Sequence, residues 1–449
     1  MQNQIFYHIY PLGLVGTPKE NDFLSAATNN LNSLVPWLEH LKALGCTALY
    51  LGPVFESTSH GYDTADYFQV DRRLGTKAQL QELVTKAHEL GIKVILDAVF
   101  NHVGRNFWAF KDLRQKGERS QYRDWFANVD FSQAGEHGDG FTYDGWHGHY
   151  QLVALNLQHP EVRAHLFSAV SEWMDRYGLD GLRLDAADVI DLDFLEALRT
   201  FCTNKKQDFW LLGEVVFGDY REWANANRLH SVTNYEYHTP LSESFNRENF
   251  EHIASILRRQ FGPAGTYKDL TLYSFVDNHD VDRAASALAE PAHLFPLYLL
   301  LFTLPGIPAI YYGSEWGFEG RIKDGTHDAL RPKAVLGAIE KQAKHPLLLD
   351  SIKRFTALRK TNKCLRQGDY KELLVQKEQL VFARALDSDV VICIINASRH
   401  VVNLEIPLGP YTSTGYKDLL NPEYSGKVRD GMLRVEIPSC WGRVLAPLD

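Results

Sequence analysis

Residues 181–185 read GLRLD and residues 210–214 read WLLGE, two short apolar runs that each end on a carboxylate. Amphipathic helical patterns lie on both sides of each run. Short apolar strands separated by helices are typical of parallel sheets, because parallel neighbours need a long crossover connection between them. The two runs therefore predict adjacent parallel strands of an α/β fold, with Asp185 and Glu214 at the same edge of the sheet.

Six further apolar runs of this kind lie in the first 345 residues, at residues 5–10, 48–51, 94–97, 232–236, 273–276 and 309–312. Between the runs apolar residues recur every three or four positions, as in residues 31–44 and 162–173, and Gly91 and Gly178 mark helix ends. Eight strands with interleaved helices predict a (β/α)8 TIM barrel. An open doubly wound sheet is the alternative, but YPLG at residues 10–13 is unlike the glycine-rich phosphate-binding turn of that fold.

Two regions depart from the barrel repeat. About sixty residues separate the third predicted strand from the helix that begins near Glu161, and they include WHGH at residues 146–149. A connection of that length is uncommon unless it is functional, so we expect a small excursion domain over the barrel mouth. From about Leu365 apolar and polar residues alternate, as in residues 402–406, which predicts a C-terminal antiparallel β-sandwich. The expected domains are a barrel of residues 1–102 and 151–360, an excursion domain of residues 103–150 and a sandwich of residues 361–449.

The composition excludes two classes of partner. The chain of 449 residues has a formal net charge of −9 and no basic tract, so nucleic acid is not expected as a partner. Its most apolar stretch, residues 294–312, is interrupted by Pro296, Pro305 and Pro308, which break a spanning helix. We expect a buried helix, a turn and a buried strand there, and no membrane partner.

Five cysteines without a CxxC pair and an N-terminus without a signal-peptide pattern predict reduced thiols and a cytoplasmic protein.

Carboxylates follow four of the predicted strands. Asp97 ends the third strand, Asp185 the fourth and Glu214 the fifth, and Asp280 follows the seventh. Active-site groups of barrels come from the carboxyl ends of strands and from the loops after them. We therefore expect the four carboxylates to converge on one opening.

Strand periodicity suggests roles within this group. Arg183 and Asp185 are two residues apart and point to the same face, and a cation favours the ionised form of a carboxylate, so Asp185 is expected as a charged nucleophile. Glu214 on the neighbouring strand would suit the acid/base role if poor solvation helps it to hold a proton. Retaining glycosidases space two such groups roughly 5 Å apart, about the spacing of adjacent strands. Asp280, with His279, would hold substrate hydroxyls and stabilise a developing oxocarbenium charge.

The four strand-end segments, read in order, resemble the sequence regions of the α-amylase family, glycoside hydrolase family 13. HGYDTADY at residues 60–67 and LPGIPAIYYG at residues 304–313 extend the resemblance over nearly the whole chain. The resemblance implies a retaining α-glucan-acting enzyme with Asp185 as nucleophile, Glu214 as acid/base and Asp280 as transition-state stabiliser. It also implies further site residues: Tyr62 as a stacking ring, His102, Arg183 and His279 as hydrogen-bond partners of the sugar, Asp97 as a support, and Arg331 with Asp328 nearby.

Two details of the resemblance stay open. Asn101 matches a ligand position of calcium-dependent members, but no second Asp ligand is evident in the excursion domain, so a structural calcium is an open prediction. No cofactor is expected for the chemistry itself. LVALN at residues 152–156 resembles the neopullulanase and cyclomaltodextrinase branch. Members of that branch carry an N-terminal dimerisation module, whereas the first barrel strand here is predicted from Ile5. Asp188 and Val189 replace the Lys-His pair of many starch-acting members.

The expected activity is hydrolysis of α-1,4-glucosidic bonds in maltooligosaccharides and α-glucans by double displacement, with some transfer to sugar acceptors. A specialist glucosyltransferase or a disaccharide-acting α-glucosidase is the first alternative. A non-catalytic glycan-binding or partner subunit is the second, and the presence of Asp185, Glu214 and Asp280 together argues against it. The residues do not determine the chain-length preference, the tolerance of α-1,6 bonds or the oligomeric state.

Overall fold

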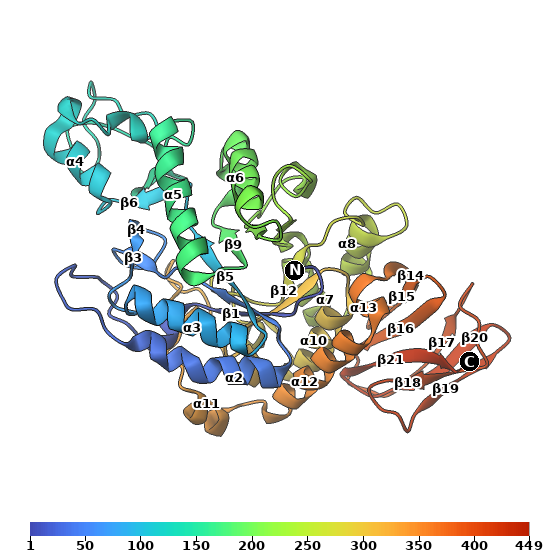
Figure 1. The fold of residues 1–449 in the computed structure, drawn as a ribbon. Helices are drawn as coiled ribbons and strands as arrows, with labels where there is room; N and C mark the ends of the chain where they lie inside the picture. The colour runs from blue at the N-terminus through green and yellow to red at the C-terminus, as the bar shows by residue number, and fades with distance from the viewer. Residues whose placement is uncertain (449) are drawn as a thin grey trace.

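The computed structural model describes residues 1–448, and eight parallel strands in it form one sheet (Figure 1). The strands are β1 (Phe6–Ile9), β2 (Ala48–Leu51), β5 (Lys93–Ala98), β9 (Gly181–Leu184), β10 (Trp210–Gly213), β11 (Ser231–Val232), β12 (Tyr273–Phe275) and β13 (Ile307–Tyr311). Their order is β11-β10-β9-β5-β2-β1-β13-β12, and a parallel bridge between Thr233 and Tyr273 joins the two ends of the sheet. The predicted (β/α)8 barrel is confirmed.

The sixth barrel strand is shorter than the sequence predicted. β11 ends at Val232, and α7 (Tyr235–Asn246) begins where the predicted strand still continued to Glu236. Buried positions in α7 recur every four residues, as on one face of a helix. Asn234 marks the change, because its side-chain amide pairs with that of Gln260 at 3.0 Å. The prediction of a strand was therefore wrong beyond Val232.

Helices connect the strands and cover the outside of the barrel (Figure 1). The longer ones are α2 (Val35–Leu44), α3 (Lys77–Glu89), α5 (Pro160–Tyr177), α6 (Leu192–Lys205), α8 (Glu251–Phe261), α10 (Leu294–Thr303) and α12 (Pro346–Thr361). Shorter ones are α1 (Pro11–Val15), α9 (Ala284–Ala287), α11 (Leu336–Gln342) and α13 (Lys363–Gln367). Thr76 and Gln79 form a capping box at the start of α3, and Gly178 ends α5 in a left-handed conformation with φ 70°. α10 and β13 are the buried helix and strand predicted for the most apolar stretch.

Large side chains fill the barrel at the amino ends of its strands. Phe6, Trp210 and Tyr273 belong to one buried cluster inside the barrel, and each is at most 4% exposed. The ring centroids of Phe6 and Trp210 lie 5.6 Å apart. A close-packed layer of this kind leaves no room for water. Polar side chains inside the barrel therefore gather at the opposite end, where the strands finish.

The connection between β5 and α5 forms a small unit of its own (Figure 1). It contains α4 (Trp108–Lys116) and a three-stranded sheet in the order β6-β8-β7, made of β6 (His102–Gly104), β7 (Gly145–Trp146) and β8 (His149–Ala154). Its core is aromatic, since the ring of Phe110 lies edge to face against Phe126 and Tyr143. Strands on both sides of the predicted limits, residues 103 and 150, take part in this sheet, and those limits stay a prediction.

The C-terminal region forms a second sheet, of eight antiparallel strands in the order β14-β15-β16-β21-β18-β19-β20-β17 (Figure 1). Its strands are β14 (Asp369–Val375), β15 (Gln379–Leu386), β16 (Asp389–Asn396), β17 (Val402–Pro407), β18 (Gly415–Asp418), β19 (Ser425–Arg429), β20 (Met432–Ile437) and β21 (Trp441–Leu448). Alternate residues of β17 and β20 are buried in a core separate from that of the barrel, as their period predicted. Arg384 of β15 is buried and donates to the carbonyl of Thr303 at the end of α10, at 2.5 Å, which ties this sheet to the barrel.

The cysteines are free thiols, and four of the five are buried. Burial raises the pKa of Cys202 and of Cys393 to about 12, so both thiols stay protonated at neutral pH. Among residues 1–448 no helix is long and apolar enough to cross a membrane.

Candidate active site

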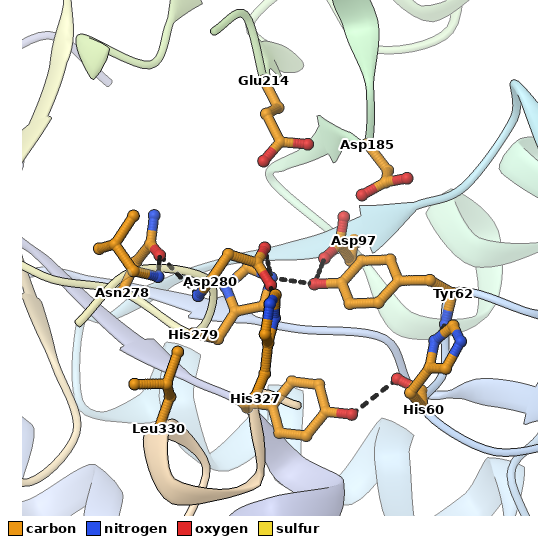
Figure 2. Close-up of polar contacts among 12 residues, drawn as sticks. His60, Tyr62, Asp97, Asp185, Glu214, Asn278, His279, Asp280, His327 and Leu330 are labelled. Carbon is orange, nitrogen blue, oxygen red and sulfur yellow. Dashed lines mark hydrogen bonds and ion pairs between the residues drawn. The ribbon is translucent and has the colours of Figure 1, made fainter. Parts of the chain in front are cut away.

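Carboxylates from four strand ends meet at the carboxyl end of the barrel (Figure 2). Asp97 lies in β5, and Asp185, Glu214 and Asp280 follow β9, β10 and β12. Leu184 and Gly213, the last residues of β9 and β10, are paired in the sheet. Asp185 and Glu214 directly follow these two residues, so they start from matching positions on neighbouring strands. The structure thus brings together all four carboxylates that the sequence placed at strand ends.

Arg183 joins three of these carboxylates. Its guanidinium is 2.9 Å from Asp97, 2.8 Å from Asp185 and 2.8 Å from Glu214, and its side chain is 3% exposed. Burial opposes the charge on Arg183, but Asp97 and Glu214 outweigh it and raise the pKa of the guanidinium well above its usual value. One cation faces three carboxylates, so the cluster carries net negative charge when all of them are ionised.

Asp185 and Glu214 are also linked through the backbone. Ala186 has φ 46°, a left-handed conformation, and its N–H donates to Glu214 Oε2 at 3.0 Å. Burial raises the pKa of Asp185 well above its usual value; Arg183 opposes the rise, and the charge of Glu214 adds to it. The sequence argument counted Arg183 alone and expected a charged Asp185. The fold adds burial and a second carboxylate, which favour the protonated form of Asp185 in the free protein.

Tyr62 bridges the Arg183 cluster and His279. Its hydroxyl donates to Asp97 Oδ2 at 3.0 Å and also contacts His279 Nε2 (Figure 2). The Tyr62 and His279 rings are stacked with their centroids 5.5 Å apart. Tyr50 donates to the same Asp97 oxygen at 2.7 Å, and Arg183 binds the other oxygen. Asp97 is therefore bound on both oxygens by protein groups, which suits the supporting position that the resemblance implied.

Asp280 lies among hydrogen-bond donors. His279 Nε2 is 2.7 Å and His327 Nδ1 is 3.0 Å from its carboxylate (Figure 2). Arg331 Nη2 makes a third contact at 2.6 Å. Burial favours the neutral acid, but His279, His327 and Arg331 together hold the pKa of Asp280 well below its usual value. Asp280 is therefore ionised at neutral pH.

His102 approaches Asp185 from the small unit between β5 and α5. Its Nε2 is 3.8 Å from Asp185 Oδ2 and has no hydrogen-bond partner among the described residues. Within the same part of the chain Trp146 Nε1 is also buried and unpartnered, and the two rings lie 5.9 Å apart. Burial, and then the charge of His60, lower the pKa of His102 to about 3, so its imidazole is neutral at neutral pH. A polar ligand beside Asp185 would satisfy both nitrogens.

Asp328, which the resemblance placed near Arg331, and Asn101, the candidate calcium ligand, do not contact the four carboxylates. Asp328 forms an ion pair with Lys19, and 62% of its side chain is exposed. Asn101 Nδ2 contacts His102 Nδ1 at 3.2 Å. In residues 1–448 no group of three or more His, Cys, Asp or Glu side chains is placed to hold a metal ion. Ca²⁺ takes about six to eight oxygen ligands, backbone and amide carbonyls among them, so a structural calcium at Asn101 stays a prediction.

Besides Tyr50 at Asp97, two side chains that the sequence did not identify contact Glu214 and Asp280. Tyr235 OH is 3.3 Å from Glu214 Oε1 and accepts a hydrogen bond from Asn278 Nδ2 at 2.9 Å. No sequence signal singles it out, because Tyr235 was placed inside the predicted sixth strand. His327 is the second. It lies four residues before Arg331, a spacing that a single turn can bring to one side, and this could have pointed to it.

Comparisons with known proteins agree with this geometry. The family model described as "Alpha amylase, catalytic domain" matches residues 21–344. A cyclomaltodextrinase of Geobacillus thermopakistaniensis (strain MAS1) is 33% identical over 392 residues, 84% of this chain and 64% of the relative. An intracellular maltogenic amylase of Bacillus subtilis is 30% identical over 396 residues, 87% of this chain and 65% of the relative. The chain thus spans less than two thirds of the length of these relatives.

A solved structure matches over nearly the whole length of both chains. It is the cyclic α-maltosyl-(1→6)-maltose hydrolase from Arthrobacter globiformis, with a TM-score of 0.80 and 25% sequence identity. The match covers 99% of this chain and 98% of that one. Both the barrel and the C-terminal sheet are therefore shared with this structure.

Proposed function

Because the chain belongs to the α-amylase family, we propose that it hydrolyses α-1,4-glucosidic bonds of maltooligosaccharides and α-glucans with retention of the anomeric configuration. The observation that carries the proposal is that one guanidinium, that of Arg183, binds both Asp185 and Glu214. Two carboxyl groups that share a guanidinium lie close together. Retaining glycosidases hold their carboxyl groups roughly 5 Å apart, whereas inverting enzymes separate them further to admit a water molecule.

The reaction has two steps. In the first, Asp185 attacks the anomeric carbon, and Glu214 gives its proton to the departing glycosidic oxygen. The bond between that carbon and oxygen breaks as the bond to Asp185 forms, which leaves a covalent glycosyl-enzyme. In the second, Glu214 takes a proton from water, the water oxygen bonds to the anomeric carbon, and Asp185 leaves as a carboxylate. Two inversions at one carbon give net retention.

The charges around Arg183 support this division of roles. One guanidinium cannot neutralise three carboxylates, and burial raises the pKa of Asp185, so the cluster around Arg183 favours holding a proton. In the reactive form Glu214 carries this proton for the leaving group. Arg183, at 2.8 Å, then stabilises the ionised Asp185 for attack.

Asp280 and the neutral groups complete the proposed mechanism. Asp280 is ionised, and a negative charge beside the anomeric centre stabilises an oxocarbenium-like transition state. Tyr62 offers an aromatic face against which a sugar ring packs. His102 offers an unpartnered Nε2, within the described residues, for a sugar hydroxyl near Asp185. Arg331 acts on the substrate through Asp280, which it contacts at 2.6 Å.

The substrate class is supported by what the relatives are called. Their names, cyclomaltodextrinase and maltogenic amylase, refer to proteins that act on α-glucans. The word "intracellular" in the name of the Bacillus protein supports the cytoplasmic setting expected from the cysteines. Transfer to a sugar acceptor is the alternative activity, because a covalent glycosyl-enzyme reacts with an acceptor hydroxyl as well as with water. A disaccharide-acting α-glucosidase would use the same carboxylates on a shorter sugar.

One experiment separates these activities. Purified protein is incubated with maltoheptaose or with maltose, and proton NMR follows the product lengths and the anomer that forms first. We expect short maltooligosaccharides released from maltoheptaose as the α-anomer. Initial release of the β-anomer would overturn retention, products longer than the substrate would assign transfer as the main reaction, and cleavage of maltose alone would assign the α-glucosidase. No turnover of either sugar would refute the proposed function.

A further inference from the structure

We propose that His327 is a positioning residue, whose Nδ1–H holds the carboxylate of Asp280 in the orientation used at the transition state. The inference rests on the proposed function, since it assigns a partner to the proposed transition-state stabiliser. Neither the strand-end segments nor the residues carried over by resemblance include His327. Its role follows from the contacts of one loop.

The loop brings two donors to one oxygen. His327 and Arg331 flank the short turn η8 (Asp328–Leu330), so their side chains emerge on the same side of it. His327 Nδ1 is 3.0 Å and Arg331 Nη2 is 2.6 Å from Asp280 Oδ1. His279 Nε2 binds the other oxygen at 2.7 Å (Figure 2). Three donors on two oxygens leave the carboxylate little freedom to rotate.

The acceptor determines the tautomer of His327. An ionised carboxylate only accepts hydrogen bonds, so the 3.0 Å contact requires a hydrogen on Nδ1. Arg331 Nη2 is 3.2 Å from the same nitrogen, and it can only donate. If Nδ1 lacked its hydrogen, it would accept from Arg331 and turn a lone pair towards Asp280. The placement of both groups therefore fits an arrangement in which His327 Nδ1 and Arg331 Nη2 each donate to Asp280 Oδ1.

The backbone of this loop is held without His327. Leu330 is fully buried, and its carbonyl accepts hydrogen bonds from Arg283 Nη2 at 2.7 Å and from Tyr311 OH at 3.1 Å. The side chain of His327 is 33% exposed, whereas that of His279 is 2% exposed. His327 is therefore the partner of Asp280 whose replacement disturbs packing least. An effect of its replacement on catalysis then reports the hydrogen bond.

Three substitutions isolate the Nδ1 donor. Asn places an amide N–H where His has Nδ1, Gln places one nearer to Nε2, and Ala removes both. We expect His327→Ala to lower kcat on maltoheptaose by roughly 10- to 100-fold with little change in KM, as for loss of one charge-assisted hydrogen bond made in the transition state. His327→Asn should recover most of that loss and His327→Gln little of it. Lys323→Gln, an exposed lysine replaced on the same loop, is the matched control and should match the wild type.

The outcomes separate this inference from the proposed function. Wild-type rates for all four variants would overturn the role of His327 while leaving the proposed function intact, as would equal rescue by Asn and Gln. An equal loss in the Ala and Asn variants would overturn donation from Nδ1. A loss that appears only as lowered thermal stability, in all three His327 variants, would assign a structural role instead.

A second measurement does not depend on activity. In ¹⁵N-histidine-labelled protein, the imidazole signals of His327 are assigned by their loss in His327→Ala, and their shifts report which nitrogen carries the hydrogen. We expect the Nδ1–H tautomer, with a shift change in Asp280→Asn. An Nε2–H tautomer, or signals unmoved by Asp280→Asn, would overturn the inference even if the protein turned over none of the sugars.

Discussion

Two clusters at the barrel mouth shift the pKa of a carboxylate in opposite directions. Around Arg183 three carboxylates share one cation, and the pKa of Asp185 is raised by burial and by its neighbours. Around Asp280 one carboxylate has three donors, which overcome burial and lower its pKa. Both carboxylates are largely buried, so burial does not decide the direction. The ratio of hydrogen-bond donors to carboxylates does.

This difference matches what the proposed reaction needs from each cluster. The leaving group requires a proton, which a cluster with too few cations retains. The developing oxocarbenium charge requires a permanent negative charge, which a cluster rich in donors secures. A substitution that makes the ratio of donors to carboxylates similar in the two clusters should therefore impair catalysis even if the fold is kept.

The largest effect is expected from removal of the nucleophile in the Arg183 cluster. Asp185→Asn should lower kcat on maltoheptaose by at least about 10⁴-fold, because the amide cannot form the covalent intermediate. The fold should stay intact, since the substitution removes a negative charge from a cluster that has too many. Circular dichroism checks the fold, and Asp193→Asn, on the exposed face of α6, is the control. If Asp185→Asn kept most of its activity, the nucleophile would be another residue.

A smaller but still large effect is expected from removal of Arg183, the cation shared by three carboxylates. Arg183→Gln leaves Asp97, Asp185 and Glu214 without the cation that they share, and we expect a loss of about 3–5 kcal/mol in the free energy of unfolding. Urea unfolding at pH 5 and pH 8 measures it. Arg183 opposes the raised pKa of Asp185, so without the cation the folded pKa of Asp185 rises further and the variant should be less stable at pH 8 than at pH 5. Arg183→Lys keeps one positive charge and should recover part of the loss. A pH-independent effect would contradict the charge argument.

The two clusters should give stability profiles of opposite slope. Asp185 has a raised pKa, so its contribution to stability is present below the unfolded value, about pH 4, and is lost as pH rises through the folded value. Asp280 has a lowered pKa, so its contribution is present above about pH 4 and is lost as pH falls through the folded value.

Melting temperatures of wild type, Asp185→Asn and Asp280→Asn between about pH 3 and pH 7 check these slopes. Relative to the wild type, Asp185→Asn should gain stability as pH rises. Asp280→Asn should lose stability relative to the wild type over the same range. Parallel profiles for the two variants would mean that the clusters do not differ in the way the contacts imply.

The smallest effect is expected at Tyr235, which sharpens the role of Glu214. Its hydroxyl is 3.3 Å from Glu214 Oε1, and Tyr235→Phe should lower kcat/KM about two- to tenfold, the value of one neutral hydrogen bond. Tyr237→Phe is the matched control. It removes a hydroxyl that donates to the carbonyl of Phe275 at 3.2 Å and should leave kcat/KM unchanged. Equal losses in both variants would point to a change in packing.

The fold was predictable to the extent that local periodicity dictates it. The second barrel strand has the predicted limits, Ala48–Leu51, and the others differ by a few residues at their ends. The prediction of the sixth strand failed beyond Val232 because Thr233 and Tyr235 are residues that favour a strand. The contact of Asn234 with Gln260 and the packing of α7, which decide otherwise, lie outside any local window. The alternating C-terminal strands were recognisable because a half-buried sheet imposes a period of two.

The candidate site was likewise predictable only where local sequence decides it. Asp328 and Arg331 were placed together by resemblance, but the turn at η8 directs His327 and Arg331 to Asp280 and leaves Asp328 paired with Lys19. Sequence spacing alone does not tell which of two adjacent residues faces inwards from a short turn. Tyr235 was out of reach of the sequence for a different reason, since its contact with Glu214 depends on the misjudged end of the sixth strand.

The sequence by itself determined the barrel, the position of Asp97, Asp185, Glu214 and Asp280 at strand ends, and the proximity of Arg183 to Asp185, because each depends on neighbours along the chain. Only the tertiary structure decided the partners of these groups and their protonation. Arg183 and Asp97 are 86 positions apart, and Tyr62 and His279 are 217 positions apart. The pKa of a buried carboxylate depends on the charges and the solvent within a few ångströms, and those are known only once distant segments have packed together.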